Sequence, residues 1–167
     1  MRVENPFVKP SRSSARQERA RTESRSRQVK PARRSSELSV IVSIGIDIIE
    51  VRRVREVMAR TPRFCERVFT QRERDYCDSR GVVAAQHYAA RFAAKEAALK
   101  ALGTGWSGGV AWQDVEISSM ESGAPVIEFH GLARQLYEQS GATAAHLSIS
   151  HTSEHAIAQV ILERAGD

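Results

Sequence analysis

Long hydrophobic segments are absent from this 167-residue chain, and cysteine is scarce. No apolar run approaches the roughly 20 residues that a membrane-spanning helix needs, and the N-terminus lacks the hydrophobic region of a secretory signal. The two cysteines, Cys65 and Cys77, are not spaced as a metal site or a redox motif. These absences argue against a membrane protein or a disulfide scaffold, and we expect reduced thiols in a cytoplasmic protein.

Common nucleotide-binding motifs are missing as well. The chain has no Walker-type phosphate loop and no dinucleotide-binding fingerprint of the βαβ type. No internal repeat is evident. A single ordinary domain with its own core is what this length predicts.

Positive charge is concentrated near the N-terminus. Residues 1–37 carry eleven Lys or Arg and four Glu, whereas the later residues carry fourteen Lys or Arg and sixteen Asp or Glu. A basic segment can attract nucleic acid or an anionic membrane surface. Residues 1–38 are also rich in Arg and Ser and poor in bulky apolar side chains, so we expect a disordered extension there. The folded domain is then expected over residues 39–167.

The composition changes abruptly at Val40, and regular elements follow. A β-branched run over 40–49 predicts a buried strand. Helices are predicted over 51–60, from about 83 to 102 and over 130–141, and Thr70 with Glu73 forms a capping box that opens another helix. Further strands are predicted over 112–119, 125–129, 144–151 and 155–162. This order of elements indicates an α+β fold.

The long helix carries a group of charged side chains, namely Arg91, Lys95, Glu96 and Lys100. Glu96 and Lys100 are four residues apart and therefore share a helix face. They could form an ordinary ion pair on a solvated helix, or they could belong to a site for a phosphorylated ligand and a divalent metal. Gly103 is suited to a left-handed helix end, and the glycine-rich loop after it is either a connector or a source of exposed backbone N–H groups.

An acidic residue interrupts the first strand. Asp47 could cap the following helix, with Glu50 in the capping-box position, or it could be a metal ligand. If the strand and the long helix pack together, Asp47 and Glu96 could share one Mg²⁺, which binds carboxylates, waters and substrate phosphates. The phosphates would then be neutralised by Arg91, Lys95 and Lys100.

His151 stands at the end of a predicted strand, just before a turn. It is either a hydrogen-bonded surface histidine or part of an anion site. Ser148, Ser150 and Thr152 alternate on one face of that strand and could donate hydrogen bonds to a ligand. The residues by themselves thus indicate an anion site with a divalent metal, without a defined substrate.

Five stretches, in the same order, resemble the holo-[acyl-carrier-protein] synthases, which are bacterial 4′-phosphopantetheinyl transferases. The resemblance covers about Val40 to Arg164. Residues before Leu38 have no counterpart in the family pattern, which indicates a lineage-specific extension or an upstream start. The stretches are Ile44–Glu50 with Arg53, Arg91–Ala101 with Gly103–Gly105, Gln113–Ile117, Gly123–Pro125 and Leu147–Thr152.

The resemblance implies a fold in which a small mixed or antiparallel sheet packs against a long helix. It implies transfer of the 4′-phosphopantetheine of coenzyme A to a serine of apo acyl carrier protein, in fatty acid biosynthesis. It also implies Mg²⁺, a homotrimer with sites between subunits, and no membrane partner. A carrier domain of a polyketide or peptide synthase is an alternative acceptor, and nucleic-acid binding through the basic segment is the alternative function.

Residue roles follow from the same resemblance. Asp47 and Glu96 match the metal ligands, and Lys100 matches the lysine that contacts the pyrophosphate and could protonate the leaving bisphosphate. All three are expected to be catalytic. The residues expected to bind coenzyme A, together with Lys100, are Arg91, His151, Gly103 and Gly105.

A second set of residues is expected to bind the carrier protein. Arg53 matches a helix arginine that contacts the acidic carrier, and the spacing of Arg60, Arg63 and Arg67 could extend that basic surface. The general base is not identified by the resemblance, and Asp75 or a water molecule could serve.

Overall fold

The computed structural model describes residues 38–105 and 108–166, and the predicted N-terminal extension up to residue 37 lies outside them. Three strands form one antiparallel sheet in the order β1-β5-β4, and two more pair as an antiparallel hairpin. The first sheet contains β1 (Val40–Glu50), β5 (His155–Arg164) and β4 (Ala144–His151). The hairpin contains β2 (Val115–Ser119) and β3 (Pro125–Phe129).

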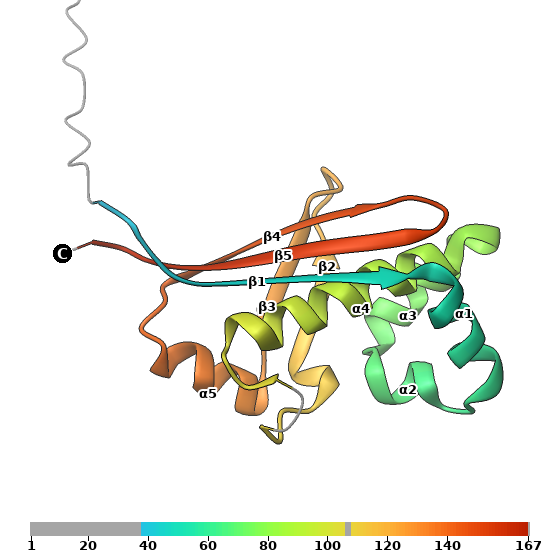
Figure 1. Ribbon diagram of the computed structural model, residues 1–167, viewed down its shortest axis with the longest axis horizontal. Helices are drawn as coiled ribbons and strands as arrows, with labels where there is room; N and C mark the ends of the chain where they lie inside the picture. Colours follow the sequence, from blue (N-terminus) through green and yellow to red (C-terminus); the bar gives the residue numbers. More distant parts are fainter. Residues whose placement is uncertain (1–37, 106–107, 167) are drawn as a thin grey trace, which may run out of the picture. The chain divides into compact units, whose positions relative to one another are not determined.

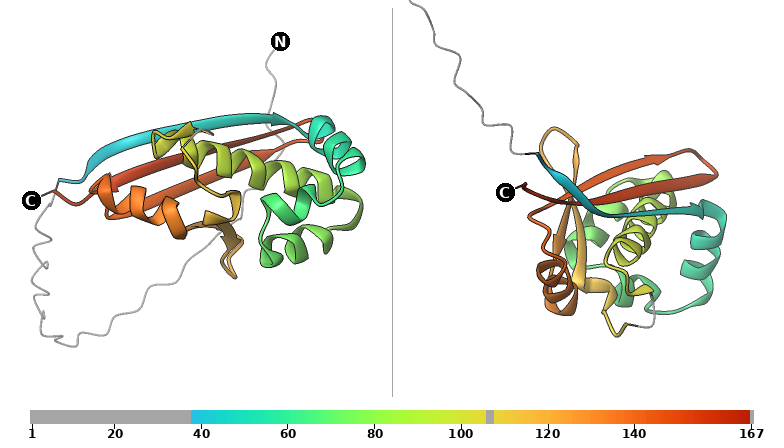
Figure 2. Two further views of the ribbon diagram at one scale, coloured as in Figure 1. Left: turned by 90° about the horizontal axis from the view of Figure 1, so that it is seen from below. Right: turned by 60° about the vertical axis from the view of Figure 1, so that its left-hand side comes forward.

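One long helix lies along the three-stranded sheet (Figure 1). This is α4 (Ala84–Ala101), which has 18 residues. Three shorter helices gather beyond the end of β1, and a fifth follows the hairpin (Figures 1 and 2). They are α1 (Val51–Arg60), α2 (Phe64–Val68), α3 (Gln71–Asp78) and α5 (Gly131–Gln139). The α+β fold with a small antiparallel sheet on a long helix is as predicted.

Small side chains let α4 approach the sheet closely. Alanines of α4 such as Ala93 and Ala97 are completely buried, so the helix is covered on most of its circumference. Gly45 of β1 faces this helix, and a Cβ atom at that position would overlap the carbonyl oxygen of Ala97. Glycine is therefore needed where β1 crosses α4.

The expectation that the first strand is buried on both faces is wrong. Ile44, Ile46 and Ile48 are 51%, 52% and 62% exposed, whereas Gly45 between them is buried against α4. These three isoleucines lie on the face of the sheet away from α4, whereas Ile49 of the same strand packs against the core. A strand with an exposed apolar face and a strand buried on both faces have the same β-branched composition. The sequence of this strand therefore could not show which of the two it is.

The two capping predictions have opposite outcomes. Thr70 and Glu73 form the predicted capping box at the start of α3. Asp47, by contrast, does not cap α1, because it remains within β1 opposite Ala158 and the N-cap position is taken by Glu50 without a side-chain hydrogen bond. The carboxylate of Asp47 is therefore left for another role.

Both cysteines are free thiols. Burial raises the pKa of Cys77 to about 12, so its thiol is not a nucleophile at neutral pH. None of the helices in the described ranges combines the length and the apolar composition that crossing a bilayer requires.

Candidate functional site

Asp47 lies on the face of β1 that is turned toward α4, and it meets Lys100 there. The Lys100 ammonium donates to Asp47 Oδ1 at 2.8 Å and to the backbone carbonyl of Ile46 at 3.0 Å. The Asp47 side chain is 15% exposed, and its second oxygen, Oδ2, is buried without a hydrogen-bond partner. A buried carboxylate oxygen of this kind is costly unless a ligand binds it.

Glu96 belongs to the same cluster. Burial raises the pKa of its carboxyl, the negative charge of Asp47 raises it further, and Lys100 partly opposes both effects. The two acids are therefore close enough to repel each other, and Lys100 pairs with Asp47 and not with Glu96. The strand and the long helix do pack together and bring Asp47, Glu96 and Lys100 close to one another, which meets the condition set in the sequence analysis. That the two acids share a metal ion stays a prediction.

The donor atoms of this cluster fit a divalent cation such as Mg²⁺. The two carboxylates offer hard oxygen ligands, among them the unpaired Oδ2 of Asp47. Mg²⁺ characteristically takes one or two carboxylates and fills its remaining positions with water and substrate phosphate. Within residues 38–105 and 108–166, no group of three or more His, Cys, Asp or Glu could hold a metal. Asp47 and Glu96 would thus supply only part of a coordination shell.

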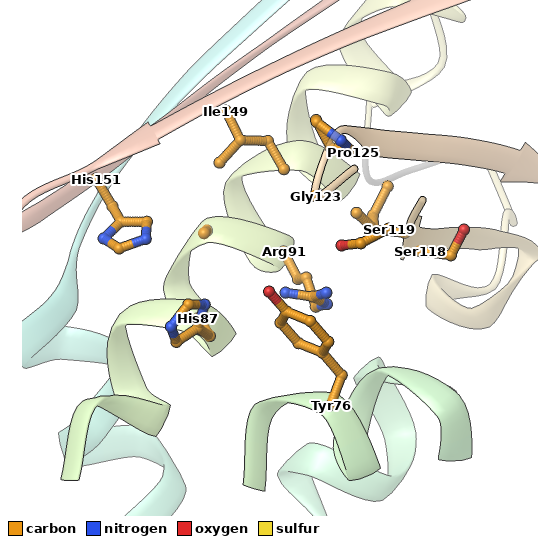
Figure 3. A pocket seen from close by; sticks show the side chains of 11 residues that line it. Tyr76, His87, Arg91, Ser118, Ser119, Gly123, Pro125, Ile149 and His151 are labelled. Atoms are coloured by element: carbon orange, nitrogen blue, oxygen red, sulfur yellow. The ribbon is translucent and has the colours of Figure 1, made fainter. Parts of the chain in front are cut away.

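Arg91 faces away from this cluster. It precedes Glu96 by five residues, which corresponds to a rotation of about 140° around the helix. Arg91 is only 4% exposed, its guanidinium lies 3.8 Å from the centre of the Tyr76 ring, and its Nε atom is buried without a partner. It lines a cavity of about 150 Å³ with His151 (Figure 3). Other lining residues are Tyr76, His87, Ser118 and Ser119.

A row of rings crosses this cavity. Tyr76 and His87 meet edge to face with ring centres 5.7 Å apart, and His87 and His151 do so at 5.1 Å. Burial lowers the pKa of His87, and the positive charges of His151, Arg80 and Arg91 add to this effect. His87 shares a helix face with Arg91 because the two are four residues apart, but no sequence signal placed Tyr76 of α3 beside them.

Lys95 does not take the role expected of it. Its side chain is fully buried, forms an ion pair with Glu73 at 2.9 Å, and donates to the backbone carbonyls of Trp112 and Val115. Burial lowers the pKa of Lys95, and the carboxylate of Glu73 opposes this shift. The prediction that Lys95 neutralises ligand phosphates is wrong, since the ammonium is enclosed by the core.

Comparison with known proteins decides the family. The sequence profile of the 4′-phosphopantetheinyl transferase superfamily matches residues 43–160. The holo-[acyl-carrier-protein] synthase of Koribacter versatilis (strain Ellin345) is 48% identical over 125 residues, which are 74% of this chain and 99% of that protein. The chain belongs to the holo-[acyl-carrier-protein] synthase family.

Solved structures of the holo-[acyl-carrier-protein] synthase family share the fold described above. That from Bacillus anthracis str. Ames, in complex with CoA (3′,5′-ADP), matches with a TM-score of 0.62 and 38% identity, over 75% of this chain and 98% of that one. That from Helicobacter pylori, in complex with coenzyme A, matches with a TM-score of 0.61 and 30% identity, over 71% and 98%. The family and fold predicted from the sequence are confirmed.

The glycines after α4 have the backbone conformations that the sequence suggested. Gly103 and Gly105 have φ angles of 73° and 52°, and Gly103 closes the helix with a hydrogen bond to the carbonyl of Lys100. A Cβ atom at either glycine would meet nothing within 4 Å, so backbone conformation and not crowding requires glycine. Trp106 and Ser107 lie outside the described residues. That Gly103 and Gly105 contact a ligand stays a prediction for this synthase.

Residues predicted to bind the carrier protein are all exposed. Arg53 and Arg60 lie on α1, and Arg63, in the turn before α2, has a left-handed φ of 64°. Asp75, one candidate general base, is exposed on α3, accepts a hydrogen bond from Gln71, and does not line the cavity of Arg91.

Proposed function

We propose that this chain transfers the 4′-phosphopantetheine group of coenzyme A to a serine of an apo acyl carrier protein. The serine oxygen forms a bond to the phosphorus on the pantetheine side of the pyrophosphate. The phosphorus–oxygen bond to the nucleotide breaks, and adenosine 3′,5′-bisphosphate leaves. Membership of the synthase family supports this reaction. The proposed active site is the Asp47–Glu96–Lys100 cluster, in which Oδ2 of Asp47 is buried without a hydrogen-bond partner.

In this proposal Asp47 and Glu96 would hold Mg²⁺, and the unpartnered Oδ2 of Asp47 is free to bind it. When bound, Mg²⁺ offsets the charge of the two carboxylates and of the pyrophosphate oxygens. Lys100 is already oriented by Asp47 and the carbonyl of Ile46. Its ammonium can contact the pyrophosphate and donate a proton to the leaving bisphosphate.

A homotrimer would explain why the charged residues form two separate groups. Arg91 and His151 lie on one flank of α4, whereas Asp47 and Glu96 lie on the other, so a second copy could bring an anion-binding flank to a metal-binding flank.

The outer face of the sheet offers a contact surface for such packing. Across β1 and β5, Ile48 lies opposite Ile157, which is 39% exposed. Head-to-tail contacts form a closed ring when the rotation between successive copies adds up to a full turn, as a homotrimer requires.

The acceptor would dock on the basic surface of α1 and the turn that follows it. Arg53, Arg60 and Arg63 are exposed there, Arg67 is exposed on the adjoining α2, and together they would attract an acidic carrier protein. A carrier of fatty acid synthesis is the acceptor we propose, and a polyketide or peptide synthase carrier domain is the alternative. The cytoplasm is where we expect the reaction to take place.

A mass-shift assay tests the function directly. Apo acyl carrier protein incubated with the chain, coenzyme A and Mg²⁺ should gain the mass of one phosphopantetheine. The Asp47→Asn variant should lose transfer by about 100-fold. Glu138→Gln should not, because the Glu138 carboxylate is exposed and pairs with Arg134. No mass gain on any apo carrier with the wild-type chain would refute the proposal.

Nucleic-acid binding through the basic segment is the competing function, and deletion separates the two. Removing residues 1–38 should leave transfer unchanged if the segment is not part of the transferase. Salt-sensitive binding of nucleic acid that disappears on this deletion, in a chain without transferase activity, would support the alternative.

A further inference from the structure

The cavity beside Arg91 contains aromatic residues to which no role has yet been assigned. Tyr76 contacts two guanidinium groups, since Arg91 lies 3.8 Å and Arg80 lies 4.2 Å from its ring centre. Figure 3 shows the Tyr76 ring next to the Arg91 side chain, with His87 and His151 beside them. The π face of a tyrosine attracts cations, so this ring can hold guanidinium groups without neutralising their charge.

Arg91 is poorly paired for a buried charge. Its side chain is nine-tenths or more buried, its Nε has no hydrogen-bond partner, and no acid within the described ranges forms an ion pair with it. A carboxylate partner would tie up the guanidinium, whereas the Tyr76 ring fixes its plane and leaves its donors free. This is the arrangement that a site for an anionic ligand requires.

The position of Tyr76 is itself determined by a buried ion pair. Glu73, three residues earlier on α3, accepts from Lys95 of α4 at 2.9 Å and from the backbone N–H of Ile117 in β2 at 3.0 Å. The same carboxylate accepts from the backbone N–H of Thr70 in the capping box. These bonds tie α3 to α4 and β2, and Tyr76 follows one helical turn later.

His87 extends the arrangement to the sheet. It contacts Tyr76 and His151 edge to face, so the Tyr76 ring is linked to the imidazole at the end of β4. Burial and the nearby His151, Arg80 and Arg91 lower the pKa of His87, which favours its neutral form. A neutral imidazole can pack beside these groups without adding a further positive charge.

We propose that Tyr76 is a positioning residue that holds the Arg91 guanidinium and, through His87, the His151 imidazole in the orientation that receives a phosphate of coenzyme A. This inference rests on the proposed function, because it takes Arg91 and His151 to be phosphate-binding residues. The alternative is that Tyr76 only fills space between α3 and α4.

Kinetics of Tyr76 variants distinguish these possibilities. Tyr76→Leu removes the π face and should raise KM for coenzyme A on the order of ten-fold, with kcat within about three-fold of wild type. Tyr76→Phe keeps the ring and should restore KM to within about two-fold of wild type. Tyr137→Leu, at a ring stacked on Phe129, is the matched control and should leave KM unchanged. An unchanged KM in Tyr76→Leu would overturn the inference.

A double-mutant cycle supplies a readout that simple packing would not change. Affinity for adenosine 3′,5′-bisphosphate is measured by calorimetry in Tyr76→Leu, in Arg91→Gln and in the double variant. If Tyr76 acts through Arg91, its loss should have little effect once Arg91 is replaced. Equal losses with and without Arg91 would overturn the inference in favour of packing.

Two further comparisons keep the test decisive. If Tyr76→Leu fails to fold, as judged by thermal unfolding, His87→Ala and His87→Phe replace it, and only the alanine variant should weaken bisphosphate binding. A wild-type chain that neither modifies a carrier nor binds the bisphosphate refutes the proposed function itself. A wild-type chain that is active, with variants that behave like it, refutes the inference about Tyr76 alone.

Discussion

The carboxylates of Asp47 and Glu96 lie close enough to repel each other, and burial adds to the cost of their charge. Lys100 offsets part of this cost through Asp47 Oδ1, but Oδ2 has no partner in the protein. At the scale of single residues, the charges of these two carboxylates therefore lower the stability of the folded chain. Such arrangements are characteristic of ligand-binding sites, where a bound group relieves the strain.

Glu96→Gln should stabilise the metal-free protein. Since the folded-state pKa of Glu96 is raised, its contribution to stability is fully present below the ordinary pKa and is lost as pH rises through the raised value. Metal-free wild-type protein should thus lose stability over this range, whereas the variant should lose less. Thermal unfolding at several pH values with a chelator measures this.

The same variant should lose transferase activity by about 100-fold, because one of the two proposed metal ligands is removed. Full activity in the mass-shift assay would rule out Glu96 as a ligand. A pH dependence of unfolding identical to that of wild type would rule out the repulsion inferred between the two acids.

At the scale of elements, the contact of α4 with β1 places the residues that we propose to be catalytic. Alanines on the helix and Gly45 on the strand remove the side chains that would hold the two backbones apart. The Ser43 hydroxyl also donates to the backbone carbonyl of Ala101 at 2.6 Å. This close approach brings Asp47 of the strand to Glu96 and Lys100 of the helix.

Gly45→Ala should therefore destabilise the fold and displace the proposed metal site. The added methyl group would overlap the carbonyl oxygen of Ala97, and overpacking of this kind costs about 3 kcal/mol. Ser43→Ala, which removes one hydrogen bond between the same elements, should cost only about 1 kcal/mol. Urea unfolding of both variants tests the difference, and equal stabilities would contradict the close packing described here.

At the scale of the whole molecule, the outer face of the three-stranded sheet is the unusual feature. Isoleucines of β1 and β5 form an apolar surface on the side of the sheet away from α4. Apolar patches of this kind on a folded chain mark contacts with other molecules. Another copy of the chain is the partner that fits the division of charged residues between the two flanks of α4.

Ile46→Glu should dissociate the proposed trimer, since it places a charge within this apolar face. Sedimentation velocity should give the mass of three chains for wild type and of one chain for the variant, and transfer activity should fall in parallel. Val82→Glu is the control, because Val82 is a fully exposed apolar residue outside the sheet. A wild-type chain that sediments as a monomer, or an Ile46→Glu trimer, would contradict this proposal.

The sequence by itself determined the order of elements and the family, and it marked Asp47, Glu96 and Lys100 as candidate site residues without placing them together. Local signals were enough for this. The β-branched run, the Thr70–Glu73 capping box and the glycine at the helix end each act over a few residues, and the predicted boundaries agree with the structure to within about three residues.

Only the tertiary structure decided which partner each of the other charged side chains has. Lys95 and Lys100 belong to the same helix and have the same charge, yet Lys95 is enclosed with Glu73 whereas Lys100 meets Asp47. Tyr76 reaches Arg91 because α3 folds back against α4. Ile44, Ile46 and Ile48 of β1 are exposed because they lie on the face of the sheet away from α4. Partners distant in sequence are selected by packing, which local sequence patterns do not encode.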